Sequence, residues 1–225
     1  MWRSRRLSGK PVPRVVAAAG NSGVSDPSYP AAIDGVISAS ATNIQNVRVA
    51  YSNFGPTTDV AVPGGNAAAT DLNQEGFVDG VIRLGADDSV NPVQYRYAFQ
   101  IGTSMAFPHV AGVIALMKGV HPGLTPQQVD DLLVMGALTI ELGSPADYGN
   151  GLIDARAAVE AAILAAGQQV PALLGVDPVD LDFAAAVSEL VITMSNVGDP
   201  NAPLSILAVS ATTDDGGAWL SVLPE

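Results

Sequence analysis

The most informative stretch of the sequence is Gly102-Thr103-Ser104-Met105-Ala106-Phe107-Pro108-His109-Val110-Ala111-Gly112. It opens a run of residues that continues to Val120, with no polar face between Val110 and Lys118, so we expect a central, buried helix. A loop therefore delivers Ser104 to the start of a helix, where free backbone N–H groups and the positive end of the dipole lie. A nucleophilic serine suits this place, because its own N–H would stabilise a developing oxyanion.

Ser104 has two other interpretations. Serine is a preferred N-cap residue, and position alone favours a mere capping role. The nucleophile elbow of the α/β-hydrolases needs Gly-x-Ser-x-Gly, but Ala106 occupies the last position, so that family fits poorly.

Short apolar runs flank this stretch and predict buried strands that end in turns. They cover residues 12–19, 35–41, 59–62 and 95–101. The first run ends in Gly20-Asn21-Ser22-Gly23, a tight-turn sequence. Residues 64–92 are rich in Gly, Asp and Asn, and we expect them to form a long insertion.

Two further helices are expected at residues 125–135 and 153–166. The first has a capping-box pattern, with Thr125 as N-cap, Pro126 at N1 and Gln128 at N3. Short buried strands mixed with helices predict an α/β domain with a largely parallel sheet, which we assign to residues 12–166.

Composition excludes several classes of protein. The 225 residues are 48% hydrophobic, with 10 basic and 22 acidic residues and a net charge of −12. Residues 15–225 hold five basic and all 22 acidic residues, a net charge of −17, which disfavours nucleic acid and anionic membranes as partners. The absence of cysteine excludes a disulfide framework, a thiol nucleophile and a Cys-ligated metal. We find no apolar run of the roughly 18 residues that a membrane span needs.

The two ends of the chain differ from its middle. Residues 1–11 hold a basic cluster without periodicity, and we expect a non-native or disordered start there. Composition shifts at residues 167–170, which we interpret as a linker. Residues 171–225 contain no Lys or Arg and alternate in polarity between turn signals, so we predict a truncated all-β sandwich.

The segment from Gly102 to Gly112 resembles the nucleophile segment of the subtilisin-like serine peptidases. Other segments resemble the family in its own order, and the likeness covers about residues 12–166. They are Val15 to Gly23, Tyr29 to Ala31, Val36 to Ala41, Tyr51 to Gly55, Asp59 to Gly64 and Tyr148 to Ala155. The resemblance implies a three-layer α/β fold with a parallel sheet and the hydrolysis of protein or peptide substrates.

The resemblance also implies roles for single residues. Ser104 would be the nucleophile and Asn21 the side-chain donor of the oxyanion hole, with Thr103 in support. On residue type alone, Asn21 could instead be a turn residue that tolerates left-handed geometry. One wall of the specificity pocket would be formed by Ala18, Ala19 and Gly20.

The chain departs from the family in one respect. A serine nucleophile needs a base and an orienting carboxylate, and in this family Asp and His precede the Ser. The sequence has two histidines, and both follow Ser104. His109 is about 500° around the helix from Ser104, and His121 is some 25 Å along it. We therefore expect that the N-terminal half of the catalytic domain is missing and that this chain alone is inactive.

A second group of candidate ligand residues lies in the expected insertion at residues 64–92. Residues 71–79 spell D-x-N-x-E-G-x-x-D, which matches the first part of an EF-hand-like calcium loop. The ligands would be Asp71, Asn73, Glu75, the carbonyl of Phe77, and Asp79. Position 12 is Ile82 rather than Glu, and Asp87 or Asp88 could replace it; otherwise the segment is a solvated acidic loop.

The sequence thus predicts the C-terminal part of a secreted bacterial serine endopeptidase, whose export signal is not in this chain. Residues 171–225 more weakly resemble a BACON or immunoglobulin-like module, in which Trp219 would pack in the core. A non-catalytic pseudoenzyme or an adhesion module is the main alternative. An esterase that keeps the serine chemistry is another.

Overall fold

The computed structural model describes residues 14–66, 70–177, 193–199 and 201–203. The chain divides into two compact units, Met1–Gln168 and Gln169–Glu225. This division falls within 167–170, the stretch expected to be a linker.

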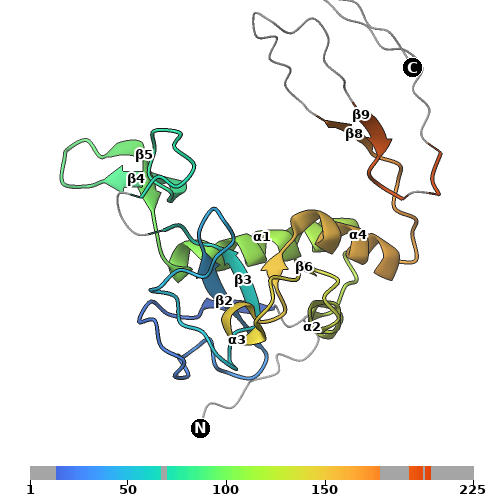
Figure 1. Cartoon of the computed structure of the whole chain (residues 1–225), viewed down its shortest axis with the longest axis horizontal. Coiled ribbons are helices and arrows are strands. Elements are labelled where there is room, and N and C mark those ends of the chain that lie inside the picture. Colours follow the sequence, from blue (N-terminus) through green and yellow to red (C-terminus); the bar gives the residue numbers. More distant parts are fainter. Residues whose placement is uncertain (1–13, 67–69, 178–192, 200, 204–225) are drawn as a thin grey trace, which may run out of the picture. The chain divides into compact units, whose positions relative to one another are not determined.

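The first unit is built on a five-stranded sheet with the order β1-β2-β3-β7-β6 (Figure 1). The strands are β1 (Val15–Ala18), β2 (Val36–Thr42), β3 (Val60–Pro63), β7 (Leu152–Ile153) and β6 (Thr139–Ile140). The first four are parallel to one another, and β6 runs antiparallel to β7. The α/β domain with a mostly parallel sheet, predicted from the sequence, is therefore confirmed.

Strands β2 and β3 form the centre of this sheet because they are buried on both faces. Six of the seven residues of β2 are buried, and so are the first three of β3. Continuous burial is typical of parallel strands covered on both sides. The small side chains of Ala39 and Ala41, both fully buried, let the neighbouring layer approach closely.

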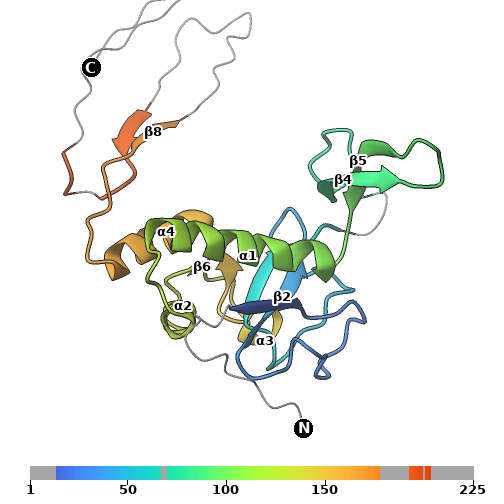
Figure 2. The same cartoon turned by 180° about the vertical axis from the view of Figure 1, so that it is seen from behind.

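Helix α1 (Thr103–Val120) lies across the sheet, with α4 (Ala155–Ala165) alongside it (Figures 1 and 2). Its buried face consists of Thr103, Ala106, Val110, Val113 and Met117. The apolar members of this face share one hydrophobic core with β2, β3 and Ala158 and Ala162 of α4. This core fixes the N-terminus of α1 at the carboxyl end of the sheet.

The expectation of a central, buried helix holds for one face of α1 only. Its opposite face is exposed, and Leu116 keeps 56% of its surface accessible. The helix is also long and apolar enough to cross a membrane by length and composition, which the sequence analysis missed. Its contacts with β1, β2 and β3 make it a helix of a protein core.

The long insertion contains a strand that the sequence analysis missed. Strand β4 (Val81–Asp87) pairs antiparallel with β5 (Gln94–Gln100), and Ile82 lies opposite Phe99. The expected strand at 95–101 therefore exists, but it belongs to this separate hairpin and not to the central sheet. Most residues of β4 are exposed, so burial periodicity gave no signal.

Two further helices complete the first unit. In α2 (Pro126–Val134), the Thr125 side chain accepts from Gln128 N and the Gln128 side chain accepts from Thr125 N, so the predicted capping box is confirmed. The short helix α3 (Pro145–Tyr148) precedes β7. Helix α4 is capped by Asp154, whose carboxylate accepts from Ala157 N at 2.8 Å.

The second unit contains the antiparallel pair β8 (Leu174–Asp177) and β9 (Thr193–Asn196). The Asn196 side chain accepts from Leu173 N and Gly198 N and closes the turn that follows β9. Most of the predicted sandwich, including Trp219, lies outside the described residues.

Candidate active site

Ser104 is the second residue of α1 and not its cap. The N-cap is Gly102, and α1 begins at Thr103. The interpretation of Ser104 as a capping residue is therefore wrong. Within the described residues, neither its exposed hydroxyl nor its backbone N–H has a hydrogen-bond partner. A free hydroxyl and a free helix N-terminal N–H therefore belong to the same residue.

Pro108 removes one backbone hydrogen bond from the start of α1. Proline lacks the N–H that would bond to the carbonyl four residues earlier, which here is the carbonyl of Ser104. The first turn itself is held by Met105 N and Ala106 N, which both donate to Gly102 O.

Asn21 follows β1 and is held by Thr103. Both the backbone N–H and the hydroxyl of Thr103 donate to Asn21 Oδ1 at 2.9 Å. Thr103 Oγ1 in turn accepts from Gly20 N at 3.3 Å. The amide oxygen of Asn21 therefore faces Thr103, and within the described part of the chain its amide nitrogen has no hydrogen-bond partner.

The two free donors border one small space. A Cβ added to Gly102 would lie 3.6 Å from Asn21 Nδ2 and 3.8 Å from Ser104 N. Gly102 has a φ of +136°, which side chains of L-residues rarely adopt. The absence of a side chain thus leaves room for a ligand atom between an amide N–H and a helix N-terminal N–H.

Tyr51 supports the loop before Ser104, and sequence reasoning missed it. Its hydroxyl lies 2.9 Å from Gly64 O and 2.7 Å from Gly65 O, and it accepts from Gly102 N at 3.1 Å. Burial raises the pKa of this phenol, and the Gly102 hydrogen bond opposes the shift. The hydroxyl therefore stays protonated and joins the end of β3 to the start of α1.

Asn53 supports the turn that carries Asn21 and was also missed. Its side chain is 6% exposed, and its Oδ1 accepts from Ser22 N at 2.9 Å and from Val24 N at 3.4 Å. A Cβ at Gly20 would collide with the Asn53 amide. The polar residues Tyr51-Ser52-Asn53, within the segment that resembles the family, were the available signal for such a supporting role.

The predicted substrate-wall residues lie beside Asn21. They are Ala18, the last residue of β1, followed by Ala19 and Gly20. Ala19 N donates to Ala39 O at 3.0 Å, which holds this segment against β2. The backbone before Asn21 is therefore fixed by the sheet.

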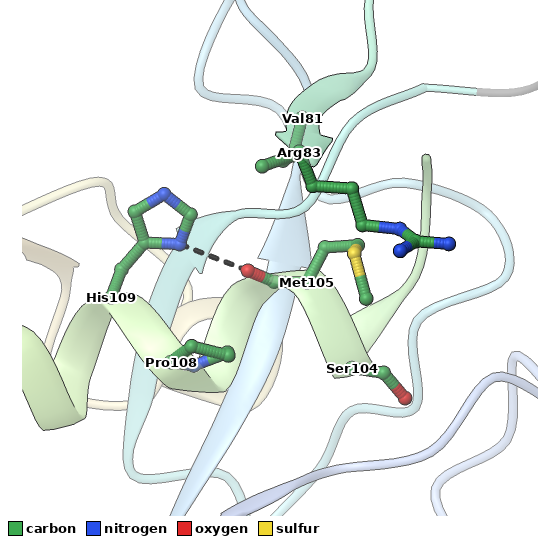
Figure 3. A pocket seen from close by; sticks show the side chains of 6 residues that line it. All are labelled: Val81, Arg83, Ser104, Met105, Pro108 and His109. Atoms are coloured by element: carbon green, nitrogen blue, oxygen red, sulfur yellow. Dashed lines mark hydrogen bonds between the residues drawn. The ribbon is translucent and has the colours of Figure 1, made fainter. Parts of the chain in front are cut away.

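A cavity of about 380 Å³ opens beside Ser104. It is lined by Val81, Arg83, Ser104, Met105, Pro108 and His109 (Figure 3). Arg83 lies on β4, whereas Ser104 lies at the start of α1, after β5. The hairpin thus forms one side of the cavity, and the first turns of α1 form the other.

Arg83 carries a positive charge without a carboxylate partner among the described residues. Arg14, Arg48, Arg96 and Arg156 each pair with an Asp or Glu. The Arg83 guanidinium instead donates to Leu84 O at 3.3 Å. In a chain this acidic, an unpaired arginine beside a free serine is a distinct electrostatic feature.

The acidic loop 71–79 lies at the base of the hairpin. Asp71 accepts from Glu75 N at 3.1 Å and from Gly76 N at 2.9 Å, while Asp79 accepts from Leu72 N at 2.7 Å. In the part of the chain that is described, no three acidic or histidine side chains gather into a preformed metal cluster. The Asn73 side chain and the Phe77 ring are exposed.

The expectation that Asp87 could complete this loop is wrong. Asp87 is the last residue of β4, where its carboxylate accepts from Ser89 and pairs with Arg96. These local hydrogen bonds lower the pKa of Asp87. An extended strand of seven residues separates it from the loop by about 20 Å.

Comparison with known proteins identifies the family. The Subtilase family model (Peptidase S8) matches residues 12–154. The chain belongs to the Subtilase family. It is 41% identical over 152 residues to the extracellular protease of Xanthomonas campestris, and 35% identical over 146 residues to a thermostable alkaline protease of Halalkalibacterium halodurans. A solved protease structure from Pseudoalteromonas arctica matches with 35% identity and a TM-score of 0.56.

This subtilase chain spans only part of those relatives. The matches cover 66% and 65% of this chain but 24% and 34% of the two proteases. The structural match covers 64% of this chain and 41% of the solved one.

No histidine of this subtilase chain reaches Ser104. His109 lines the same cavity, but its Nδ1 is bound to Met105 O at 2.9 Å and its ring points away from Ser104 (Figure 3). His121 is the C-cap residue at the opposite end of α1. Neither histidine can therefore take a proton from Ser104 in this structure.

Proposed function

We propose that this subtilase chain carries the nucleophile and the oxyanion hole of a serine endopeptidase that cleaves protein or peptide substrates. The observation that carries the proposal is the hydrogen-bonded unit of Asn21, Thr103 and Ser104. It presents a free hydroxyl next to two free N–H donors.

The chemistry follows from these atoms. Ser104 Oγ attacks the carbonyl carbon of the scissile peptide bond, and its proton passes to a base. The carbonyl oxygen, now negative, accepts hydrogen bonds from Asn21 Nδ2 and Ser104 N. Collapse breaks the C–N bond and gives the proton to the leaving amine. Water then cleaves the acyl ester on Ser104 and regenerates the hydroxyl.

The base and its carboxylate are assigned to an N-terminal half of the catalytic domain, which is the required partner of this chain. Both histidines are excluded by their positions on α1. Two surfaces suit such a partner: the exposed apolar face of α1 around Leu116, and β1, an edge strand of the sheet on which Val15 is 48% exposed.

Substrate binding, location and the second unit belong to the same proposal. The backbone of Ala18, Ala19 and Gly20 would line the specificity pocket beside Asn21. The protein would act outside the bacterial cell, as the Xanthomonas relative, an extracellular protease, does by its name. The β8–β9 pair would be part of a BACON or immunoglobulin-like sandwich.

The test is to read the locus upstream of Met1 and to express the resulting longer protein. We expect subtilisin-type Asp and His segments upstream, hydrolysis of casein by the longer protein, and none by the present chain. Ser104→Ala should abolish hydrolysis.

Two results would overturn the proposal. Hydrolysis of short acyl esters with casein spared would indicate an esterase. An upstream sequence that lacks either the Asp or the His would leave a pseudoenzyme or a binding module.

A further inference from the structure

One face of the β4–β5 hairpin is apolar and exposed to solvent. Side chains alternate along a strand, and the antiparallel register places the even-numbered residues of β4 opposite the odd-numbered residues of β5. All six side chains on this side are exposed, and Tyr95 and Tyr97 keep 70% and 76% of their surfaces accessible. We call this set the aromatic face; its members are Ile82, Leu84, Ala86, Tyr95, Tyr97 and Phe99.

The aromatic face is large for an exposed apolar surface. Three of its side chains are aromatic, and an aromatic side chain can bury about 150–250 Å². Phe77 extends the surface, because its ring centroid lies 6.0 Å from that of Phe99 and the residue is itself 60% exposed. Contiguous apolar patches above a few hundred Å² are rare on soluble monomers and mark binding surfaces.

The geometry of the aromatic face fits an extended polypeptide. Side chains on one side of a strand repeat at about 6.8 Å, which is also the interval between alternate side chains of an extended peptide. In the described part of the chain, β5 has β4 as its one strand partner, so the outer edge of β5 can pair with a further strand. A peptide paired there would add its own apolar side chains to the aromatic face.

Strand β5 also connects this surface to the nucleophile. It ends at Gln100, and Ile101 and Gly102 lead directly to Ser104 in the first turn of α1. Gly102 N donates to Gly64 O at 2.9 Å, which fixes this short connection. A polypeptide with one bond at Ser104 can therefore continue along the hairpin.

Charge and area both disfavour a second copy of this chain as the occupant. The aromatic face carries no charge, but the chain around it has a net charge of −12, so two copies repel each other. A stable dimer buries about 800 Å² on each partner, more than the several hundred Å² that this face offers. Weak binding of an uncharged apolar segment meets neither obstacle.

The side of the hairpin that faces Ser104 is not the aromatic face. Val81 and Arg83 line the cavity beside Ser104 (Figure 3), and alternate residues of a strand point to opposite sides. A segment that brings a base to Ser104 has to reach the cavity. It can do so without covering the aromatic face.

We propose that the aromatic face and the free edge of β5 bind an extended apolar segment of the polypeptide substrate, outside the cavity at Ser104. This inference rests on the proposed protease function and adds a substrate class to it. The enzyme would prefer unfolded chains with alternating apolar residues over short peptides.

Binding is tested on the present full chain, independently of hydrolysis. The probe is a fluorescein-labelled peptide of 12 residues that alternates leucine and serine, and a glycine–serine peptide of equal length is its control. By fluorescence anisotropy we expect a dissociation constant on the order of 10⁻⁴ M for the first peptide and no binding of the second. The double variant Leu84→Ser/Tyr97→Ser, at directly paired positions, should weaken binding at least about fivefold.

Two further variants control for altered folding and general stickiness. Tyr95→Ser, at a residue 70% exposed, should weaken binding while the thermal unfolding midpoint stays unchanged. Val134→Ser removes an apolar side chain of similar exposure, 73%, on α2 and should bind as the parent does. Equal binding by the parent, the double variant and Tyr95→Ser would overturn the proposal.

Hydrolysis by the longer protein tests the link to catalysis. A short peptide taken from a cleavage site in casein is compared with the same peptide extended by the leucine–serine segment. We expect the extension to raise kcat/KM about five- to tenfold through a lower KM, and Leu84→Ser/Tyr97→Ser to abolish this gain without slowing cleavage of the short peptide.

Three results would overturn the inference and identify another occupant or none. Binding of the leucine–serine peptide to the present chain but not to the longer protein would show that the N-terminal half covers the aromatic face. A dimer of the present chain in sedimentation velocity that Leu84→Ser/Tyr97→Ser dissociates would assign the face to a second copy. No binding by the parent would leave the face without the proposed ligand, whereas binding without any hydrolysis by the longer protein would instead count against the protease function.

Discussion

At the scale of residues, Thr103 decides how Asn21 is oriented. An amide can present either its oxygen or its nitrogen, and the two hydrogen bonds from Thr103 hold the oxygen inward. The donor side then faces the space next to Ser104 N. The positioning is local, because β1 and α1 meet at this point.

Thr103→Val should therefore lower kcat in the longer, active protein. It removes the hydroxyl that donates to Asn21 while the backbone N–H remains, and the loss of one hydrogen bond predicts a fall of about tenfold with little change in KM. Thr103→Ser keeps the hydroxyl and should restore most of the rate. Equal effects of both variants would show that Thr103 acts by packing alone.

Asn21→Ala should cost roughly 10²–10³-fold in kcat, the scale known for this family's own oxyanion-hole amide.

The raised pKa of Asp59 predicts how the stability of the fold depends on pH. Its Oδ2 accepts from Ser38 N at 2.7 Å, but burial dominates and raises the pKa of the carboxyl above 3.8, its ordinary value. Between the ordinary pKa of 3.8, which applies to the unfolded chain, and the raised pKa of folded Asp59, the folded state binds more protons than the unfolded state. The free energy of unfolding therefore falls as the pH rises through this window.

Asp59→Asn should abolish the fall in stability that the ionisation of Asp59 causes as the pH rises. We expect the variant to gain stability over the parent progressively as pH rises from about 4, and to keep the gain at neutral pH. Denaturant unfolding across this range measures it, with Asp34→Asn, at an exposed aspartate, as control. A gain that is the same at every pH would contradict the pKa argument.

At the scale of elements, the β4–β5 hairpin brings a positive charge to the cavity beside Ser104. Arg83 lines the cavity with Ser104 and Met105 and has no acidic partner in the described chain (Figure 3). Arg96, on the paired strand, is instead bound to Asp87. The two arginines thus form a natural comparison within one hairpin.

Arg83→Ala should selectively slow the cleavage of peptides that carry an acidic side chain next to the scissile bond. We expect kcat/KM for such peptides to fall about five- to tenfold in the longer protein, while neutral peptides are unaffected. Arg96→Ala should leave this preference unchanged. Peptide-library cleavage measures both, and equal loss on acidic and neutral peptides would argue against a charge contact.

Sequence patterns predicted the elements whose burial is regular. The strands β1, β2 and β3 were visible because both their faces are apolar, and α2 was visible through its capping residues. Strand β4 was not, because most of its side chains are exposed and its partner alone defines it. Ser104 and Asn21 were found by resemblance, whereas Tyr51 and Asn53 act through backbone atoms that a linear pattern does not show.

At the scale of the whole molecule, the described residues hold the proposed nucleophile and the proposed oxyanion donors but no histidine within reach of Ser104. Among the described strands, β1 forms one edge of the central sheet, and α1 exposes an apolar face around Leu116. The proposed oxyanion donors both lie within residues 14–120, yet neither histidine reaches Ser104. This division predicts that chemistry at Ser104 depends on a partner segment, although the serine itself is already in place.

Adduct mapping with a fluorophosphonate tests this central claim most directly. The present chain and the longer protein are treated side by side, digested and analysed by mass spectrometry. We expect a phosphonyl adduct on Ser104 in the longer protein, slower labelling in Asn21→Ala, and no adduct in the present chain. An adduct on another residue, or labelling that survives Ser104→Ala, would contradict it.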